Sequence, residues 1–584
     1  MTILTPFSHY LQSNQAPSED ETCELKTLRA KPLEEISIID VEIERIEGIL
    51  NSLKRKRAHI QDSIDDFNTI LSPVRRLSTD VLGVIFTHCI ATHRNPIMSA
   101  SEAPILLTQI CRDWRSIALS IPRLWSRLYI PTSHKVRAFL PEGLPYVLEG
   151  ERRIEARTEE VQKWLRLSAA CPLAITLMPA SDPVSHPPLL DSIIQSSRRW
   201  QQLEFGPPLS PESDVLARLL RLSPDDLCML RELRIHSLYS SASSYSQDVQ
   251  EDLWYQSGLL TAPGLRSISI ANIHRINAFP AGIPPNWKNL NHLFIHSPIS
   301  LGLAHQILTY CCNLAACLLE IIQWDDWDGY TNIDTSISLS LCILPHLTFL
   351  SLQGDSTGCG QLFNSIVAPS LQILDFQGTY PRESQKFGLF NFLQNINSLE
   401  TLRVDPQFLT ESNVVKCSTL IPSVTHLVLG RSPKRRYNYI HFPAHYAYPG
   451  HLNFTILHEF GHQYSPDSSP TLLFPSLEIF EAYYISGVTD NMLLEFIKGR
   501  IDATKSNANI SKLKKVLVEF LRTRQRDIVP EALAYAQAAG MKLEVDLRYY
   551  TATENSYITF DETWSPSFGI TSDDVSWVYP LHDY

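Results

Sequence analysis

The chain has 584 residues, of which 44% are hydrophobic and 19% are charged, and its formal net charge is -12. This length exceeds what one hydrophobic core serves, so we expect several modules. The negative charge argues against a surface that neutralises phosphate, so nucleic acid is not the expected partner. The chain starts without a basic region followed by an apolar run, and no later stretch is apolar enough to span a bilayer. We therefore expect no membrane partner and a location in the cytoplasm, the nucleus or both.

The eleven cysteines are scattered along the chain and form no C-x-x-C pair. Most of them stand among apolar neighbours. This usage predicts reduced, buried side chains and no structural metal site.

A long amphipathic helix is predicted over residues 31–71, after a polar arm over 1–30 that we expect to be disordered. Residues in this helix recur at alternating steps of three and four, which is the a/d seam of a heptad repeat. The seam consists of Ile36, Ile39, Ile43, Ile46, Leu50, Leu53, Arg57, Ile60, Ile64, Phe67 and Leu71. Arg57 interrupts the apolar series. Pairing with a second copy to form a homodimer and packing on another domain therefore both stay open.

The next segment has apolar residues and tryptophans at the spacing of short helices. Residues 71–90 read LSPVRRLSTDVLGVIFTHCI, and residues 103–130 read APILLTQICRDWRSIALSIPRLWSRLYI. Ser78 or Thr79 can cap a helix that has an apolar stripe at helical spacing. The segment resembles the F-box. The matching residues are Leu77, Asp80, Val81, Leu82, Ile85 and Phe86, then Ile110, Cys111, Arg112, Trp114, Ile117, Ala118 and Trp125.

The resemblance implies a three-helix module that docks on the adaptor subunit of an SCF (cullin-RING) ubiquitin ligase, and through it on the cullin. The residues that it places at this contact are Leu77, Asp80, Val81, Leu82, Ile85, Phe86, Ile110, Trp114 and Trp125. Ser78 departs from the family pattern, which has proline there, and this departure predicts weaker docking. The insertion between Cys89 and Pro104 is longer than in compact F-boxes. A heptad helix followed by SPVRRL is similar to the style of large fungal, basidiomycete-type F-box families.

A second pattern recurs after a polar, proline-bearing stretch that is predicted to be a linker. An apolar residue is followed by apolar residues three and five positions later. The pattern starts at Trp200, Leu230, Leu265, Leu290, Leu314, Leu347, Leu371, Leu399, Val424, Leu477 and Leu513. Most spacings are about 24 to 36 residues, which suits a short strand, a helix and their turns, the unit of a leucine-rich repeat. One parallel strand per repeat is expected. A multilayer α/β domain with similar strands is the alternative.

If this register holds, side chains four and six residues after each start lie on the open strand face. The predicted target-binding residues are Phe294, His296, Gln353, Asp375, Arg403, Asp405, Glu481 and Tyr483. Ser351 and Gln377 belong to the same rows. Mixed polar, charged and aromatic side chains suit protein recognition, so we expect an unidentified protein as the target.

A rival hypothesis rests on His458-Glu459-Phe460-Gly461-His462, which matches the H-E-x-x-H motif of zinc peptidases. On a helix, His458 and His462 can bind one zinc while Glu459 acts as general base. Against this, Pro466 and Pro470 limit any helix after His462. The stretch also fits the repeat register as Leu452-Thr455-Leu457, and no third histidine follows at metzincin spacing.

The sequence thus predicts a multidomain α plus α/β protein with a long N-terminal helix, a small three-helix F-box and an irregular leucine-rich-repeat-like solenoid. The expected parts are 1–30 (disordered arm), 31–71 (coiled-coil helix), 72–130 (F-box), 131–165 (linker), 166–548 (repeat domain) and 549–584 (C-terminal tail). The expected function is a non-catalytic substrate adaptor of an SCF ligase, without cofactor or metal. A zinc peptidase and a ligase-independent F-box scaffold are the alternatives.

Overall fold

The computed structural model describes the chain in separate segments. They are 6–12, 14–92, 94–131, 146–178, 187–205, 218–235, 257–271, 282–321, 339–379, 388–405, 411–430, 450–451 and 472–549. The chain consists of two compact units, Met1–Leu82 and Gly83–Tyr584.

One helix dominates the first unit. This helix, α1 (Glu19–Leu71), follows the short 3-10 helix η1 (Ser8–Gln12). Ser18 and Glu21 form a capping box, in which the Ser18 hydroxyl accepts from the Glu21 N–H and the Glu21 carboxylate accepts from the Ser18 N–H. The disordered arm predicted for 1–30 is therefore wrong for 19–30, because this cap starts the helix well before its apolar seam.

The heptad seam of α1 is exposed. Its ten apolar members, from Ile36 to Leu71, are 45% to 67% exposed. No residue of α1 is buried.

A 3-10 turn, η2 (Pro73–Arg76), and then α2 (Thr79–His88) follow α1. Ser78 caps α2: its hydroxyl accepts from the Val81 N–H at 3.4 Å, and its carbonyl accepts from the Leu82 N–H at 3.0 Å. Of the two candidate caps, Ser78 and Thr79, the structure uses Ser78. Proline has no hydroxyl to supply this bond, so the residue that departs from the family pattern has a local role of its own.

Short helices open the second unit and lead directly into a sheet. They are α3 (Leu107–Ile110), α4 (Arg112–Ser120) and the 3-10 helix η3 (Pro122–Trp125), and the first strand, β1 (Arg127–Pro131), follows after a single residue. The domain boundary predicted between residues 130 and 131 thus falls inside β1.

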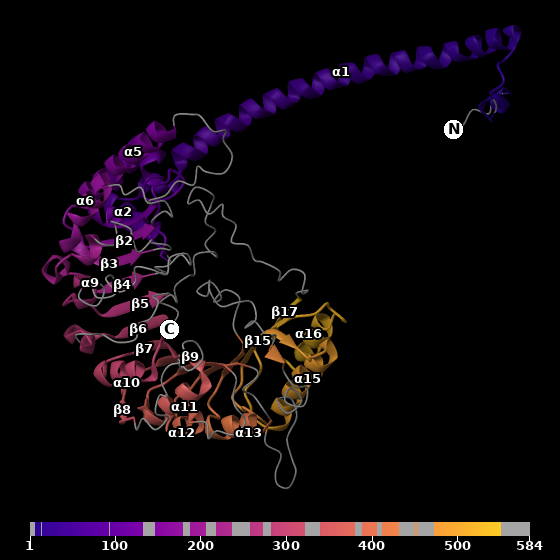
Figure 1. Ribbon diagram of the computed structural model, residues 1–584. Coiled ribbons are helices and arrows are strands. Elements are labelled where there is room, and N and C mark those ends of the chain that lie inside the picture. Colours follow the sequence, from indigo (N-terminus) through magenta and orange to yellow (C-terminus); the bar gives the residue numbers. More distant parts are fainter. Residues whose placement is uncertain are drawn as a thin grey trace. The chain divides into compact units, whose positions relative to one another are not determined.

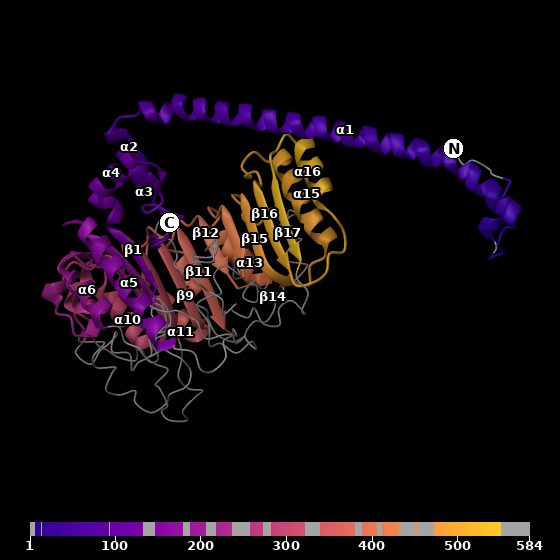
Figure 2. The ribbon, with the colours of Figure 1, turned by 90° about the horizontal axis from the view of Figure 1, so that it is seen from above.

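Among the described residues of the second unit, a parallel sheet of 15 strands forms the body. Besides β1, its strands are β2 (Leu173–Met178), β3 (Trp200–Phe205), β4 (Glu232–Ile235), β5 (Ser267–Ala271), β6 (His292–Ile299), β7 (Ala316–Ile321), β9 (Phe349–Asp355), β11 (Ile373–Thr379), β12 (Thr401–Val404), β13 (His426–Leu429), β14 (Gly450–His451), β15 (Ile479–Ser486), β16 (Lys515–Phe520) and β17 (Glu544–Tyr549). They follow one another in chain order, with β14 at the side on β15 (Figures 1 and 2). Two further short strands, β8 (Cys342–Ile343) and β10 (Ile366–Val367), pair with each other.

Helices and 3-10 turns connect these strands. They are α5 (Tyr146–Leu167), α6 (Pro187–Ile194), η4 (Ser197–Arg199), η5 (Pro224–Leu227), α9 (Gly258–Thr261), η6 (Pro285–Asn289), α10 (Leu301–Tyr310), α11 (Ser356–Ser365), α12 (Leu389–Leu393), α13 (Glu411–Leu420), α15 (Asp490–Ser506) and α16 (Val529–Ala538). Figure 1 shows α10, α11, α12 and α13 along one side of the strands. This is a mixed helix and parallel-sheet fold with a long N-terminal helix.

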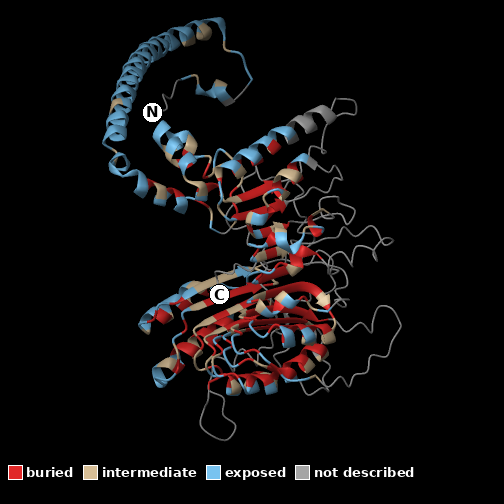
Figure 3. Ribbon diagram, turned by 90° about the vertical axis from the view of Figure 1, so that its left-hand side faces the viewer, coloured by how far each residue is buried: buried red, intermediate tan, exposed pale blue. Residues whose placement is uncertain are grey.

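The recurring apolar pattern forms the core under the sheet. Leu290, Leu293 and Ile295 are fully buried, and Leu293 pairs in register with Cys317 of β7, which pairs with Leu350 of β9. A buried aliphatic side chain of this kind contributes about 1.5–3 kcal/mol. Trp200 starts a strand, and each of the other ten predicted pattern positions stands two residues before one, so the parallel strand predicted at each of them is confirmed. Figure 3 shows the strands largely buried and α1 exposed.

The linker predicted over 131–165 is wrong from residue 146 onward, where α5 begins. Val161 and Trp164 of α5 are buried, and the Trp164 ring meets the Trp125 ring edge-on at 4.9 Å between centroids. These apolar residues recur at helical spacing and pack on the end of the short-helix segment. The predicted tail, 549–584, begins with the last residue of β17, and 550–584 lie outside the described residues.

None of the helices in the described segments is long and apolar enough to cross a membrane.

Candidate protein-interaction surfaces

A small aromatic core holds the short helices of the second unit. The rings of Phe86 and Trp114 lie 4.8 Å apart between centroids, which joins α2 to α4. Trp125 is buried, and its indole N–H donates to the Ala118 carbonyl at 2.9 Å. Aromatic contacts of this type add about 0.5–1.5 kcal/mol beyond the burial itself. The short helices therefore have a core of their own.

The outer side of these helices is apolar as well. Val84 and Ile85 on α2 are 59% and 40% exposed, and Ile110 on α3 is 56% exposed. Leu106 and Leu119 are each 38% exposed. Several large aliphatic side chains at the surface of one small segment are typical of an interaction site. We call these five residues the apolar docking surface.

The residues predicted to contact the ligase adaptor fall into two groups. Leu77, Asp80, Val81, Ile85 and Ile110 are exposed, and Trp114 is partly buried. Leu82, Phe86 and Trp125 are buried. The expectation of direct contact is therefore wrong for these three, because their positions on the helices turn them to the core instead of the outside.

Sequence reasoning missed three members of the apolar docking surface: Val84, Leu106 and Leu119. The signal for Val84 was present in the sequence, since it stands three residues after Val81 on the same helix face. Leu106 precedes α3 and Leu119 is near the end of α4, so their exposure depends on tertiary packing that helical spacing alone does not specify.

Arg127 of β1 fixes the segment before α3 to the sheet. Its guanidinium donates from Nε to Asn95 Oδ1 at 3.1 Å, and from its two terminal nitrogens to the Ala91 and Arg94 carbonyls at 2.9 Å each. Asn95 in turn donates to the Thr176 hydroxyl of β2 at 2.9 Å. Burial, followed by the charge of Arg234, lowers the pKa of Arg127. The insertion between Cys89 and Pro104 is therefore anchored to the first two strands.

Replacing Arg127 by methionine removes these three donors and leaves the side-chain stem in place. We expect amide hydrogen exchange at residues 94, 95 and 97 to become about tenfold faster or more, because opening of this segment no longer has to break these three bonds. Hydrogen exchange followed by mass spectrometry measures this effect. Arg123→Met, at an exposed arginine of η3, is the matched control and should leave exchange unchanged. Equal exchange in both variants would contradict the anchoring role.

The residues predicted to form the open strand face do lie in shared rows. Asp375 of β11 pairs with Ser351 of β9 on one side and with Arg403 of β12 on the other. Gln353 and Gln377 pair in the next row of the same face. The predicted register is thus confirmed for these strands.

Most of this face is not open. Phe294, His296, Gln353, Asp375 and Tyr483 are buried, and Arg403, Asp405 and Glu481 are partly buried. The prediction of an exposed row is therefore wrong for the first five. Two physical reasons are visible, namely apolar packing and internal hydrogen bonds, and they act in different parts of the face.

Apolar packing dominates where β6, β7 and β9 pass. Phe294, Ala316, Leu318 and Phe349 form one buried cluster, with Ile373 packed against it. Neighbouring strands lie about 4.8 Å apart, so large side chains in adjacent rows cover one another. Polar side chains beside this cluster bond to each other: Gln377 donates to Asp375 at 3.0 Å.

Charged residues gather further along the same face, around Glu481 of β15. The Tyr483 hydroxyl donates to the Glu481 carboxylate at 2.7 Å, the Lys515 ammonium lies at 3.3 Å, and His426 Nε2 lies at 3.8 Å. Burial alone would raise the pKa of Glu481, but His426, Tyr483 and Lys515 together lower it to about 2. Glu481 is therefore ionised near neutral pH, and its charge is compensated by its neighbours.

The described residues contain no group of three or more histidine, cysteine or acidic side chains that could hold a metal ion. Glu459 and the two histidines of the H-E-x-x-H motif, His458 and His462, lie outside the described residues.

The cysteines have mixed environments. Cys311, Cys317, Cys342, Cys359 and Cys417 are buried, Cys171 is intermediate, and Cys23, Cys89, Cys111, Cys228 and Cys312 are exposed, all as free thiols. Burial raises the pKa of the Cys417 thiol to about 12. The prediction of buried cysteines is therefore right for five of the eleven and wrong for the exposed ones.

No family model matches the chain, and no curated protein matches it either.

Proposed function

We propose that this chain is the substrate-recognition adaptor of an SCF (cullin-RING) ubiquitin ligase. The apolar docking surface on α2, α3 and α4 binds the ligase's adaptor subunit. The parallel sheet is a leucine-rich-repeat-like solenoid that holds a protein target. The observation that carries this proposal is the exposed apolar outside of a segment that already has its own aromatic core.

The energetics of this surface favour a protein partner. Ile110 is 56% exposed and Val84 is 59% exposed. Burying such half-exposed aliphatic side chains against a partner contributes about 1 kcal/mol each. A few well-packed residues near the centre of an interface usually supply most of its binding energy.

The segment 79–125, which carries the apolar docking surface and is called the docking segment below, is joined to the sheet in a way that supports the adaptor role. Arg127 and Asn95 bond the insertion to β1 and β2, and Trp125 packs on Trp164 of α5. A firm connection holds a bound target at a fixed distance from a bound ligase. Such positioning raises the effective concentration of the target's lysines near the transferred ubiquitin, which the associated enzymes deliver.

The target itself is expected to meet the charged part of the strand face. His426, Arg403, Glu481 and Lys515 are only partly buried there, and they carry both signs of charge. Partly exposed polar and charged groups at fixed positions favour recognition of a protein surface with complementary charges.

Binding of the purified ligase adaptor subunit to the full chain tests the proposal. Ile85→Asp and Ile110→Asp each place a charge on the apolar docking surface, and both positions are exposed enough for the fold to survive. We expect each variant to bind the adaptor subunit about 30-fold more weakly or worse. Calorimetry or surface plasmon resonance measures the affinity. Trp114→Asp is less informative, because Trp114 packs on Phe86 in the core.

Leu533→Asp on α16 is the matched control, since Leu533 is 39% exposed and lies far along the chain from the docking segment. It should bind as well as the natural protein. Absence of binding by the folded natural protein would sink the ligase proposal and leave the scaffold and zinc-peptidase alternatives. Equal binding by all variants would place the contact elsewhere on the chain.

A further inference from the structure

The apolar stripe of α1 is exposed along its whole length. Its ten apolar seam residues are each at least 45% exposed, although they repeat over the length of five heptads. Burial of a seam of this kind drives helices to associate in pairs. The charges beside the seam indicate which partner fits, and in which direction.

The seam fixes the heptad positions of its flanking residues. Counting Ile36 as position a puts Glu35 and Glu42 at g, and Asp40, Glu47 and Lys54 at e. The flanks are thus acidic in the first half of the stripe and become basic at Lys54. Residues at e and g decide the orientation of coiled-coil helices, because they face each other across the seam.

A parallel pair places like charges together. Each g residue then faces the e residue of the next heptad on the other helix. Glu35 would face Asp40, and Glu42 would face Glu47, with no opposite-charge pair to offset them. Glu42 also bonds Arg45 of its own helix at 2.7 Å, which reduces the second repulsion but leaves the first. A parallel dimer is therefore disfavoured.

An antiparallel pair places opposite charges together. When the two helices cross with the centre of the pair between Asn51 and Ser52, position a of one helix meets position d of the other. Residues at e then face residues at e. Glu47 then faces Lys54 of the second copy, and this pair occurs twice by symmetry. The layers nearest the centre contain Leu50 against Leu53, which keeps the middle of the interface apolar.

The interrupting residue also fits this arrangement. Arg57 at position a meets Ile46 of the second copy, and Glu47 follows that Ile46 in the sequence. Its long stem can cover the isoleucine while the guanidinium reaches the carboxylate. In a parallel pair, Arg57 would instead meet Arg57 of the other copy.

We infer that α1 forms an antiparallel coiled coil with a second copy of this chain, centred between Asn51 and Ser52, with Glu47 paired to Lys54 of the partner copy. This inference is independent of the ligase proposal. In such a dimer the two Leu71 ends of the paired helices lie about 60 Å apart along the coiled coil.

Sedimentation equilibrium of the full chain tests the inference through Glu47→Lys. In the antiparallel pair this change creates two like-charge contacts with Lys54, and we expect dimerisation to weaken about fivefold or more. In a parallel pair the same change creates attraction to Glu42 and strengthens dimerisation. The two orientations thus predict opposite signs for one variant.

Charge exchange supplies the matched control. Lys54→Glu alone should weaken the dimer by a similar factor, and the double variant Glu47→Lys/Lys54→Glu should restore the natural affinity within about twofold. Glu47 and Lys54 are both exposed, so the fold of α1 does not depend on either side chain. A natural chain that stays monomeric up to about 100 µM, a larger oligomer, or a Glu47→Lys variant that dimerises more tightly would overturn the inference.

Discussion

Replacing Arg500 by methionine is expected to lower the free energy of unfolding of the second unit by about 4 kcal/mol. Arg500 lies on α15 and is fully buried. Its guanidinium donates to the Leu473 carbonyl at 2.9 Å, the Phe474 carbonyl at 3.1 Å and the Leu477 carbonyl at 3.3 Å. Methionine fills much of the same space but leaves three carbonyl groups without these donors, and each lost bond to a charged donor costs about 1.5–3 kcal/mol.

The backbone that Arg500 holds is itself strained. Phe474 has a φ of 48°, a conformation that side chains other than glycine rarely adopt, and its N–H donates to the Ser418 hydroxyl at 2.7 Å. Burial lowers the pKa of Arg500 to about 10, so the guanidinium still carries its charge at neutral pH. Arg500 therefore stabilises the turn that leads into β15 against its own strain.

Urea denaturation followed by circular dichroism measures this loss. Arg524→Met is the matched control, because Arg524 is 47% exposed and pairs with Asp527 at the surface. We expect the control to change stability by less than about 0.5 kcal/mol. Arg500→Lys should fall between the two, since one ammonium cannot reach all three carbonyls. Equal stability of Arg500→Met and Arg524→Met would show that the buried bonds do not hold the turn.

The strands were predictable because the apolar residues that each strand buries recur at fixed spacing in the sequence. In the pattern that starts at Leu290, Leu293 and Ile295 alternate with residues of the other face, and all three apolar residues are fully buried. Alternation of this kind predicts both the strand and its register in the sheet. The repeat at Leu347 follows the same rule, with Leu350 and Leu352 buried.

The ends of the sheet were harder to predict. β2 alternates Leu173, Ile175 and Leu177 and thus carries a strand signal, but it lacks an apolar residue at the usual starting position. β1 was absorbed into the segment that resembles an F-box, because its apolar residues follow Trp125 directly. The apolar side-chain pattern changes at the ends of the sheet, whereas the sheet itself continues through backbone hydrogen bonds.

Exposure of the strand face could not be predicted from register. The rows place Asp375 between Ser351 and Arg403 correctly, but its burial depends on such neighbours from other repeats. These contacts join residues far apart in the chain. For the docking segment the difficulty is similar, since Leu82 and Ile85 belong to one apolar stripe while only Leu82 faces the core.

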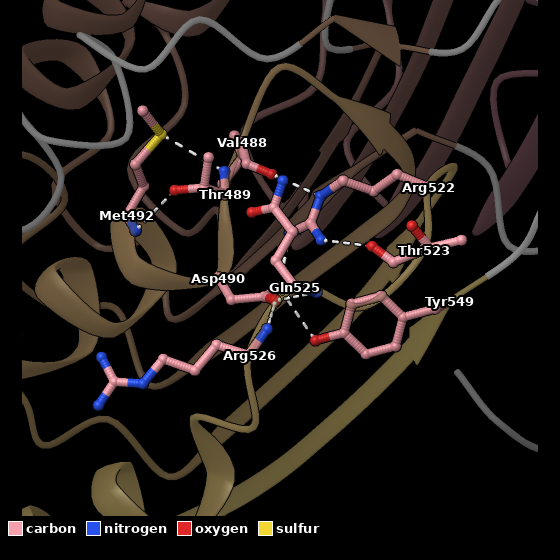
Figure 4. A network of polar contacts seen from close by, with 9 residues as sticks. All are labelled: Val488, Thr489, Asp490, Met492, Arg522, Thr523, Gln525, Arg526 and Tyr549. Atoms are coloured by element: carbon pink, nitrogen blue, oxygen red, sulfur yellow. Dashed lines mark hydrogen bonds and ion pairs between the residues drawn. The ribbon is translucent and has the colours of Figure 1, made fainter.

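Replacing Asp490 by asparagine is the other change expected to be severe, at about 3 kcal/mol. Asp490 opens α15, and its side chain is 1% exposed. Its carboxylate accepts from the Arg522 guanidinium at 2.6 Å and from the Arg526 and Gln525 N–H groups at 2.7 Å and 2.8 Å (Figure 4). The Tyr549 hydroxyl of β17 donates to it at 3.0 Å.

Four donors around one carboxylate leave no suitable place for an amide. Asparagine keeps the shape, but its NH2 group would face donors, and Arg522 would lose the opposite charge that compensates it. The network joins the start of α15, the turn after β16 and the last described strand, so its loss is expected to loosen this end of the sheet. Asp527→Asn is the matched control, because Asp527 is 53% exposed. This substitution should cost less than about 0.5 kcal/mol.

The pH dependence of stability separates the charge of Asp490 from its shape. Burial alone would raise the pKa of Asp490, but the hydrogen bonds from Arg522, Arg526, Gln525 and Tyr549 lower it below its usual value. A carboxyl with a lowered pKa in the folded state stabilises the protein above its unfolded pKa of about 3.9, and this contribution disappears as the pH falls through the folded value. The stability difference between the natural protein and Asp490→Asn should therefore be full near neutral pH and shrink below about pH 4. Denaturation midpoints measured from neutral to acid pH test this. A difference that stays constant would mean that Asp490 contributes by its fit in the network and not by its charge.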